Sequence, residues 1–191
     1  MMERPILFSG PMVRAIKERH KTQTRRVVRW PKWADPERDE AALRDAAGVA
    51  YYTDGVPRKV FCCPWGRPGD RLWVRETWKD NEPPNGWLYR ATDELLVHRD
   101  ERPWRPSIFM PRRASRLTLS ITDVQVERLH DISDEDAKAE GCVLSPSTCV
   151  GASRTPYRVQ FFQLWDAINL ERGFGWDTNP LVWAISFEQV G

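Results

Sequence analysis

A short polar segment near the start of the chain, Lys21-Thr22-Gln23-Thr24-Arg25-Arg26, carries the residue types best suited to catalysis. A threonine hydroxyl can attack a carbonyl carbon once a base removes its proton, and a neutral lysine can be that base. Lys21 and Thr24 share a face if the backbone is helical or turned there, but not if it is extended. Burial, with Arg25 or Arg26 nearby, would lower the pKa of Lys21 toward neutrality. The cluster is equally typical of a phosphate site at a basic helix-to-strand junction, and spacing alone favours that second interpretation.

Other kinds of reactive site do not match the sequence. The four cysteines form no Cys-x-x-Cys pair, so the spacings of zinc sites are absent. The three histidines lie in separate segments, and there is no Gly-x-Gly-x-x-Gly or Walker motif for a dinucleotide or triphosphate. We therefore expect no metal ion and no cofactor.

The composition is that of a globular protein with locally concentrated positive charge. The 191 residues carry a net charge of only +2, yet residues 1–30 hold eight basic residues against two acidic ones, and residues 102–116 hold five arginines and no acid. If these segments meet, they form one basic face suited to nucleic acid. No apolar run approaches the roughly 20 residues that span a bilayer, and the few cysteines suggest a reducing compartment. We expect a cytoplasmic protein without a membrane partner.

Loop tryptophans beside arginines are candidates for stacking on a base. Trp65 precedes Arg67, and Trp104 lies between Arg102 and Arg105. Aromatic side chains in such loops stack on unpaired bases, although they also cover small hydrophobic cores. Trp65 is therefore a candidate ligand contact.

The periodicity of apolar residues predicts an α+β fold. Strands are expected at 4–8, 71–78, 87–91, 116–129 and 181–187, with helices after Ser9, after Ser133 and from Thr155. Ser133 with Asp136 is a helix-capping signature, and Gly141 is expected to end that helix. In the last helix, the residues expected to face inward are Val159, Phe162, Leu164, Trp165 and Ile168. The alternating run 116–129 is long enough to bend around a barrel. Residues 30–60 resemble an insertion with a short helix (37–47) and a hairpin that pairs 49–52 with 59–62.

The polar segment resembles the signature of the ASCH superfamily, Gly-x-Lys-x-x-Glu-x-Arg. Lys21 and Arg26 match it, whereas Arg19 stands at the glycine position and Thr24 at the glutamate position. The small bacterial N4-acetylcytidine amidohydrolases of that superfamily share part of this departure, with a Lys-Thr-x-Thr-x-Arg pattern that Lys21, Thr22, Thr24 and Arg26 reproduce. The whole chain also resembles bacteriophage and prophage ASCH-domain proteins, in the stretches Arg4–Ser9, Lys21–Val28, Pro68–Trp78, Ser133–Gly141 and Gly175–Phe187.

The resemblance implies a single ASCH domain over residues 1–191, with a PUA-like, five- to six-stranded curved mixed β-barrel, packed helices and the insertion at about 30–60. It implies a nucleoside- or RNA-directed amidohydrolase in which Lys21 is the general base and Thr24 the nucleophile. An ungapped alignment of 118–141 places Glu140 at the position of the third catalytic residue. The amidohydrolases are about half this length, and residues 30–115 have no aligned counterpart.

Contacts to a modified nucleoside or RNA are expected from six further residues, namely Thr22, Arg25, Arg26, Trp65, Arg75 and Glu76. Two alternatives use the same basic cleft. One is a non-catalytic module that binds RNA or a modified nucleotide, and the other is a ribonuclease. Convergence of Lys21, Thr24 and Glu140 on one pocket would favour the amidohydrolase over the binding module.

Overall fold

The structure is a computed structural model of the chain. It describes residues 1–35, 39–40, 43, 48–53, 56–80, 86–93, 103–143 and 156–190. Within these ranges, no helix is both long enough and apolar enough to cross a membrane. The strands are β1 (Glu3–Leu7), β2 (Gln23–Val27), β3 (Gly48–Thr53), β4 (Val56–Cys62), β5 (Arg71–Arg75), β6 (Trp78–Asp80), β7 (Trp87–Tyr89), β8 (Thr118–Arg128) and β9 (Leu181–Gln189). The α-helices are α1 (Gly10–Lys17), α3 (Arg90–Asp93), α4 (Asp134–Ala139) and α5 (Pro156–Asn169).

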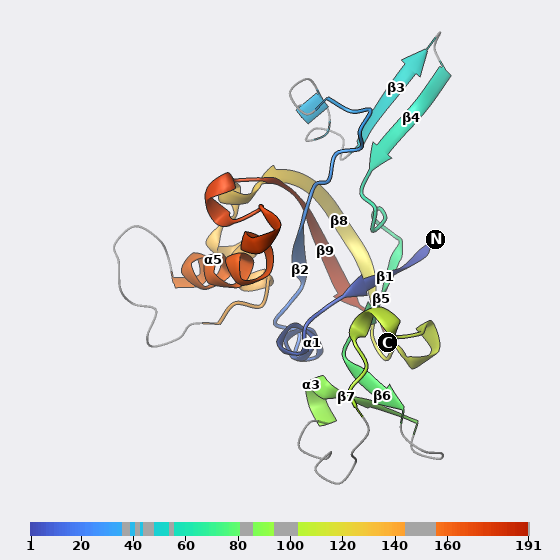
Figure 1. Cartoon of the computed structure of the whole chain (residues 1–191), viewed down its shortest axis with the longest axis vertical. Coiled ribbons are helices and arrows are strands. Elements are labelled where there is room, and N and C mark those ends of the chain that lie inside the picture. Colours follow the sequence, from blue (N-terminus) through green and yellow to red (C-terminus); the bar gives the residue numbers. More distant parts are fainter. Residues whose placement is uncertain are drawn as a thin grey trace.

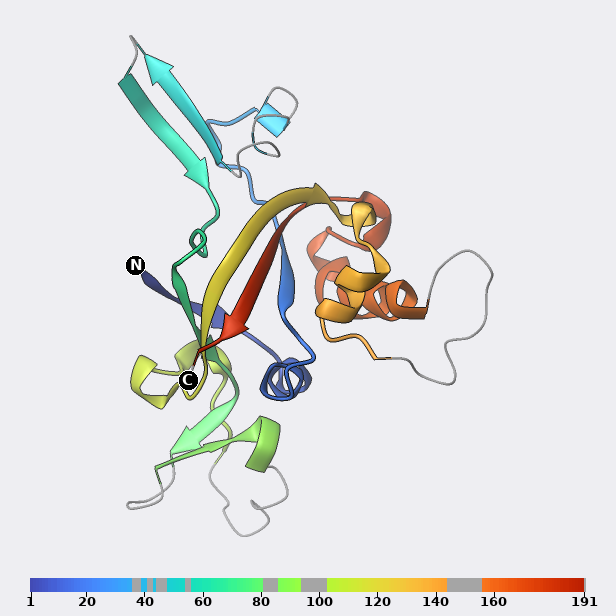
Figure 2. The ribbon, with the colours of Figure 1, turned by 180° about the vertical axis from the view of Figure 1, so that it is seen from behind.

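A five-stranded sheet in the order β1-β5-β8-β9-β2 forms the centre of the fold. β1 runs parallel to β5, and the other neighbouring strands are antiparallel. The predicted strand over 116–129 is confirmed as β8, whose register against β9 shifts between Ile121 and Asp123. Such a bulge increases bending, and β8 arches across the sheet beside β9 (Figures 1 and 2). The mixed, curved α+β architecture is therefore as expected.

The expected closure into a barrel is wrong for the part of the chain that the structure describes. β1 and β2 are the two edges of the sheet, and neither pairs with the other. A side chain links them instead, because Arg26 Nη2 of β2 donates a 2.7 Å hydrogen bond to the carbonyl of Leu7 in β1. The sheet curls far enough to bring its edges within reach of one arginine, but not far enough for a backbone ladder. β2 therefore keeps a free edge.

The two faces of the sheet pack against different layers. Along β9, Trp183, Ile185 and Phe187 point into the main core, which also takes Val13 and Ile16 of α1. Val182 points to the other face and packs in a second cluster with α5. The same alternation applies to β2, where Thr24 lies opposite Ile185 and Arg26 opposite Trp183. Thr24 and Arg26 thus share the core-facing side, and Arg25 faces the helix layer.

Local sequence signals set the helix boundaries. Ser9 is the N-cap residue of α1, whose second residue is Pro11. The predicted capping box is confirmed, since the Ser133 hydroxyl accepts from the backbone of Asp136 at 3.0 Å and donates to its carboxylate at 2.8 Å. Gly141, with a φ of +88°, follows the end of α4 as expected. The helix predicted from Thr155 begins at Pro156.

The predicted hairpin is present. β3 and β4 pair as an antiparallel two-stranded sheet that extends away from the central sheet (Figure 1). The two predicted stretches do pair, and the register places Val49 opposite Phe61 and Ala50 opposite Val60. The expected helix over 37–47 lies mostly outside the described residues. A second small sheet, β6–β7, lies at the opposite end of the molecule (Figure 1).

Candidate active site

Lys21 and Glu140, 119 residues apart in sequence, form a buried ion pair. Lys21 Nζ lies 2.6 Å from Glu140 Oε2 and donates a second hydrogen bond of 2.8 Å to the backbone carbonyl of the same residue. The two side chains are 0% and 4% exposed. Burial lowers the pKa of Lys21 below its ordinary value, although the charge of Glu140 opposes the shift. Two of the three predicted catalytic residues are therefore in direct contact.

Backbone pairing of the segments around Lys21 and Glu140 fixes this contact. Lys21 and Glu140 form an antiparallel bridge, and the Thr22 amide donates to the Ala139 carbonyl at 2.8 Å. The next residue, Gly141, lies so close that a Cβ on it would stand 3.1 Å from Lys21 Cβ and 3.2 Å from Ala15 Cβ. Glycine at this position therefore allows the end of α4 to approach the lysine.

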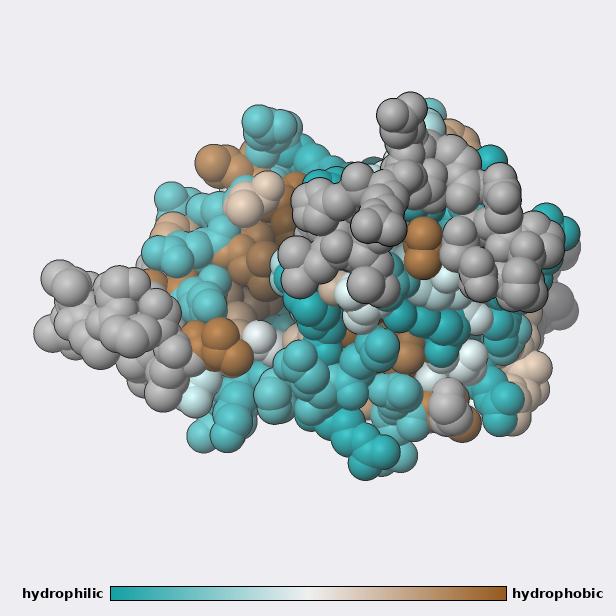
Figure 3. Space-filling view, turned by 90° about the horizontal axis from the view of Figure 1, so that it is seen from below, coloured by the Kyte–Doolittle hydropathy of each residue, from teal (hydrophilic) through white to brown (hydrophobic). Residues whose placement is uncertain are grey.

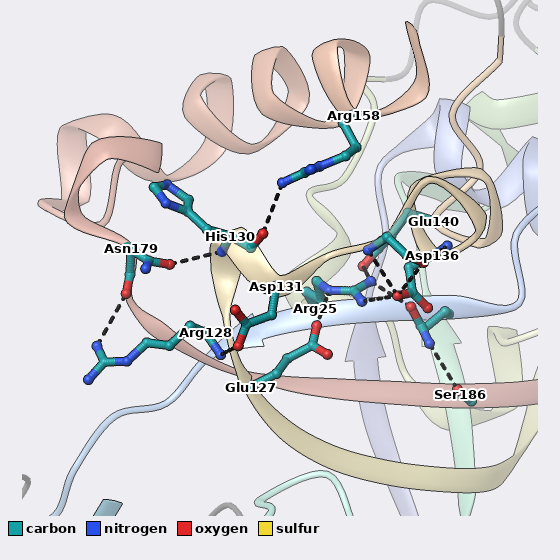
Figure 4. Close-up of polar contacts among 12 residues, drawn as sticks. Arg25, Glu127, Arg128, His130, Asp131, Asp136, Glu140, Arg158, Asn179 and Ser186 are labelled. Atoms are coloured by element: carbon teal, nitrogen blue, oxygen red, sulfur yellow. Dashed lines mark hydrogen bonds and ion pairs between the residues drawn. The ribbon is translucent and has the colours of Figure 1, made fainter. Parts of the chain in front are cut away.

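Arg25 holds the carboxylates around this pair rather than facing a ligand alone. Its Nε lies 2.6 Å from Glu127 Oε1, its Nη2 3.2 Å from Asp136 Oδ2, and its Nη1 3.5 Å from Glu140 Oε1. Figure 4 shows the guanidinium between Glu127 of β8 and the two carboxylates of the α4 region. Burial raises the pKa of Glu127, while the charge of Arg25 opposes that shift. The side chain predicted as a substrate contact lines the cavity and also holds these three carboxylates together.

A cavity of about 500 Å³ surrounds the free edge of β2, and Glu140 lies in its wall. Thr24, Arg26 and Trp65, all expected at the site, also line it. The helix layer supplies an apolar wall from α5 and the segment after it, made of Phe161, Leu164, Trp165, Ile168 and Phe174. A mostly apolar cavity of this size with a few convergent polar groups is typical of a small-molecule site.

Three polar atoms of the cavity residues are buried without a hydrogen-bond partner among the described residues. Arg25 Nη2, a donor, still forms an ion pair with Asp136, and the other two atoms belong to Arg26 and Glu140. These two are Arg26 Nε, a donor, and Glu140 Oε1, an acceptor. Leaving a buried polar group unpaired costs about 1–3 kcal/mol. Glu140 Oε1 lies in an ion pair with Arg25 Nη1, but at 3.5 Å it has no hydrogen bond. A ligand with one acceptor and one donor would satisfy Arg26 Nε and Glu140 Oε1.

Lys21 touches this cavity only through Glu140. It is not among the residues that line the cavity, but its amine contacts the Glu140 carboxylate, and Lys21 itself lines a separate surface hollow. Thr22 lines two separate surface hollows instead. The predicted contacts from β5 and the residue after it also lie elsewhere. The Glu76 carboxylate receives two hydrogen bonds from Arg116, at 2.9 and 2.8 Å, and Arg75 stacks 4.6 Å from the Trp73 ring.

The two basic segments do not meet at the cavity. Its arginines are Arg25, Arg26, Arg29 and Arg172, and none comes from 103–116. Within that stretch, arginines pair with acids of other strands, as Arg105 does with Asp80 of β6 and Arg112 with Glu3 of β1. The sequence shows where the basic residues lie along the chain, but it does not show which carboxylates they contact in the fold.

The wall formed by α5 was only partly foreseeable. Phe161 and Trp165 are the buried pair of this helix, and Phe161 was not among the residues expected to face inward. Leu164 and Ile168, one turn apart on the neighbouring face, line the cavity, and Ile168 is 42% exposed. Seen from below, the surface is mostly hydrophilic, and its hydrophobic side chains gather in the half toward α5 (Figure 3). The sequence signal for this wall is the apolar face of the helix, which is wider than packing against the core requires.

Comparisons with known proteins give matches among solved structures alone. No protein-family model and no curated protein matches the sequence. The chain is similar to protein EF3133 from Enterococcus faecalis V583, of family DUF984, with a TM-score of 0.44, 10% identity, and coverage of 100% of this chain and 81% of that one. It is also similar to an ASCH domain from Lactobacillus crispatus JV V101, with a TM-score of 0.42, 10% identity, and coverage of 98% and 79%.

Proposed function

We propose that the protein hydrolyses the amide bond of an acylated nucleobase, with N4-acetylcytidine as the representative substrate. One observation carries this proposal, namely the unsatisfied donor Arg26 Nε and the unsatisfied acceptor Glu140 Oε1 in a cavity that Thr24 also lines. An N-acylated amino group on a base offers the complement of both, a carbonyl oxygen that accepts and an amide N–H that donates. Trp65 adds an aromatic surface on which a base can stack.

The residues divide the reaction into two steps. Thr24 Oγ1 attacks the carbonyl carbon, and its proton leaves for the Lys21–Glu140 pair, with neutral Lys21 as the final acceptor. Arg26 stabilises the negative charge that develops on the carbonyl oxygen. The C–N bond then breaks, the pair returns the proton to the departing amino nitrogen, and the acyl group remains on Thr24 as an ester. Water hydrolyses this ester, giving a carboxylic acid and restoring the hydroxyl.

Burial of Lys21 supports its role as a base. A lysine must be neutral to accept a proton, and the pKa of this buried amine is lowered. Its partner Glu140 is held by Arg25 on one side and faces the cavity on the other. Glu140 can therefore pass a proton between the cavity and an amine that does not itself line it.

The decisive experiment is incubation of the pure protein with N4-acetylcytidine and detection of cytidine and acetate. Thr24→Val keeps the branched shape and removes the hydroxyl, so kcat should fall at least about 100-fold while KM changes little. Thr22→Val is the matched control, because this neighbouring threonine lies outside the cavity, and its kcat should stay at the wild-type value.

Other outcomes would replace the proposal. A protein that is inert toward acylated nucleosides but binds RNA, with affinity that falls as salt rises, would be a binding module. Release of RNA fragments in the same assay would indicate a ribonuclease. Equal loss of activity in the two threonine variants would remove Thr24 from the catalytic role.

A further inference from the structure

The mouth of the cavity carries two arginines that have no role in the proposed amide hydrolysis. Arg29 follows β2, and Arg172 ends the short 3-10 helix Leu170–Arg172 after α5. Both side chains line the cavity, and both residues are exposed, so they lie where the cavity opens to solvent. The ring of Phe174 lies 5.9 Å from the Arg29 guanidinium and helps to hold that side chain at the mouth.

Neither arginine at the mouth has an acidic partner among the described residues. Arg25, Arg112 and Arg116 each form an ion pair with a carboxylate, whereas no such pair is present for Arg29 or Arg172 within the described part of the chain. Among the described residues that line the cavity, Glu140 is the only acid, and its carboxylate is buried in contact with Lys21 and Arg25. The mouth therefore has positive charge that the described residues leave uncompensated.

We propose that the cavity takes the acylated nucleoside as its phosphorylated form, with the phosphate held by Arg29 and Arg172. This inference rests on the proposed function for the identity of the base and adds the class of substrate. The base lies at the inner end, against Arg26 Nε and Glu140 Oε1, and the charged group lies at the solvent-exposed end. Arginine suits this role because its planar guanidinium can donate two parallel hydrogen bonds to phosphate oxygens.

Binding is measured by calorimetry in the Thr24→Val background, where the ligand is not consumed. The probes are N4-acetylcytidine, its 5′-monophosphate, and a trinucleotide with N4-acetylcytidine in the middle. At low salt the monophosphate should bind about 10- to 100-fold more tightly than the nucleoside, and the ratio should shrink as salt screens the contact. The Arg29→Gln/Arg172→Gln variant should reduce this ratio to about threefold or less. Arg113→Gln, which removes an equally exposed arginine outside the cavity, should leave the ratio intact.

The results separate this inference from the proposed function. Equal affinity for nucleoside and monophosphate, no binding of either, or a preference that survives in the double variant would overturn the phosphate site, whether or not the protein deacylates nucleosides. A protein without hydrolase activity that still shows the arginine-dependent preference would retain the phosphate site and lose the proposed function. Tighter binding of the trinucleotide than of the monophosphate would assign the phosphate to an RNA strand.

Discussion

Replacing Lys21 by Met tests whether the buried pair is both a structural and a chemical unit. The variant keeps the length of the side chain and removes the amine. The Glu140 carboxylate, which is only 4% exposed, then lacks the amine that lies 2.6 Å from it. Removing one member of a buried ion pair typically costs 3–5 kcal/mol of unfolding free energy. The remaining contact of Glu140 with Arg25 Nη1, at 3.5 Å, compensates for part of the loss. We therefore expect a loss of about 3 kcal/mol, at the lower end of that range.

A double-mutant cycle measured by urea denaturation provides the control. In Lys21→Met/Glu140→Met, no charge of the pair remains buried, so the double variant should be less destabilised than Lys21→Met alone. Arg25 keeps its contacts with Glu127 and Asp136 in that background. If Lys21→Met costs less than about 1 kcal/mol, or if the two single losses simply add, the pair is not the coupled unit described here.

Three further predictions concern the same region of the fold. Arg19 has a φ of +60°, a conformation that favours glycine, so Arg19→Gly should raise the unfolding free energy by about 0.5–1 kcal/mol in urea denaturation, and a loss would contradict this. Gly141→Ala should cost more than Gly69→Ala in the same assay, because both have φ near +90° but only the first would place a Cβ against Lys21 and Ala15; equal losses would contradict the close approach. Because burial lowers the pKa of Lys21, the folded state binds fewer protons than the unfolded state between the lowered value and the ordinary 10.5. The stability of the wild type relative to Lys21→Met should therefore rise from about pH 8 to about pH 10, and a fall over that range would refute the shift.

Arg19 adopts a backbone conformation that is usual for glycine. The signature has glycine where this chain has Arg19, and the structure gives that residue a left-handed backbone conformation. The turn is closed by hydrogen bonds from the amides of His20 and Lys21 to the Ala15 carbonyl, at 2.8 and 3.0 Å. Arg19 therefore adopts a left-handed conformation for which glycine is better suited than arginine.

The sequence by itself determined the local structure, because its signals act within a few residues. The Ser133 capping box, the stop at Gly141 and the start of α5 at Pro156 depend on neighbouring backbone groups, and all three are present. The alternation along 116–129 likewise determined a long strand, since side chains of a strand point to opposite faces in turn. These signals specify elements and the residues that share a face.

Tertiary structure alone decided which of those residues meet. Lys21 and Glu140 touch because β2 pairs with β9 and α4 follows β8, contacts that no local pattern encodes. The same packing turned Arg25 toward carboxylates, placed Glu76 against Arg116, and left β2 as an open edge instead of a strand in a closed barrel. Hydrogen bonds and ion pairs depend on the distance between atoms, and sequence spacing does not give that distance for residues a hundred positions apart. The pairing of elements therefore decided the site.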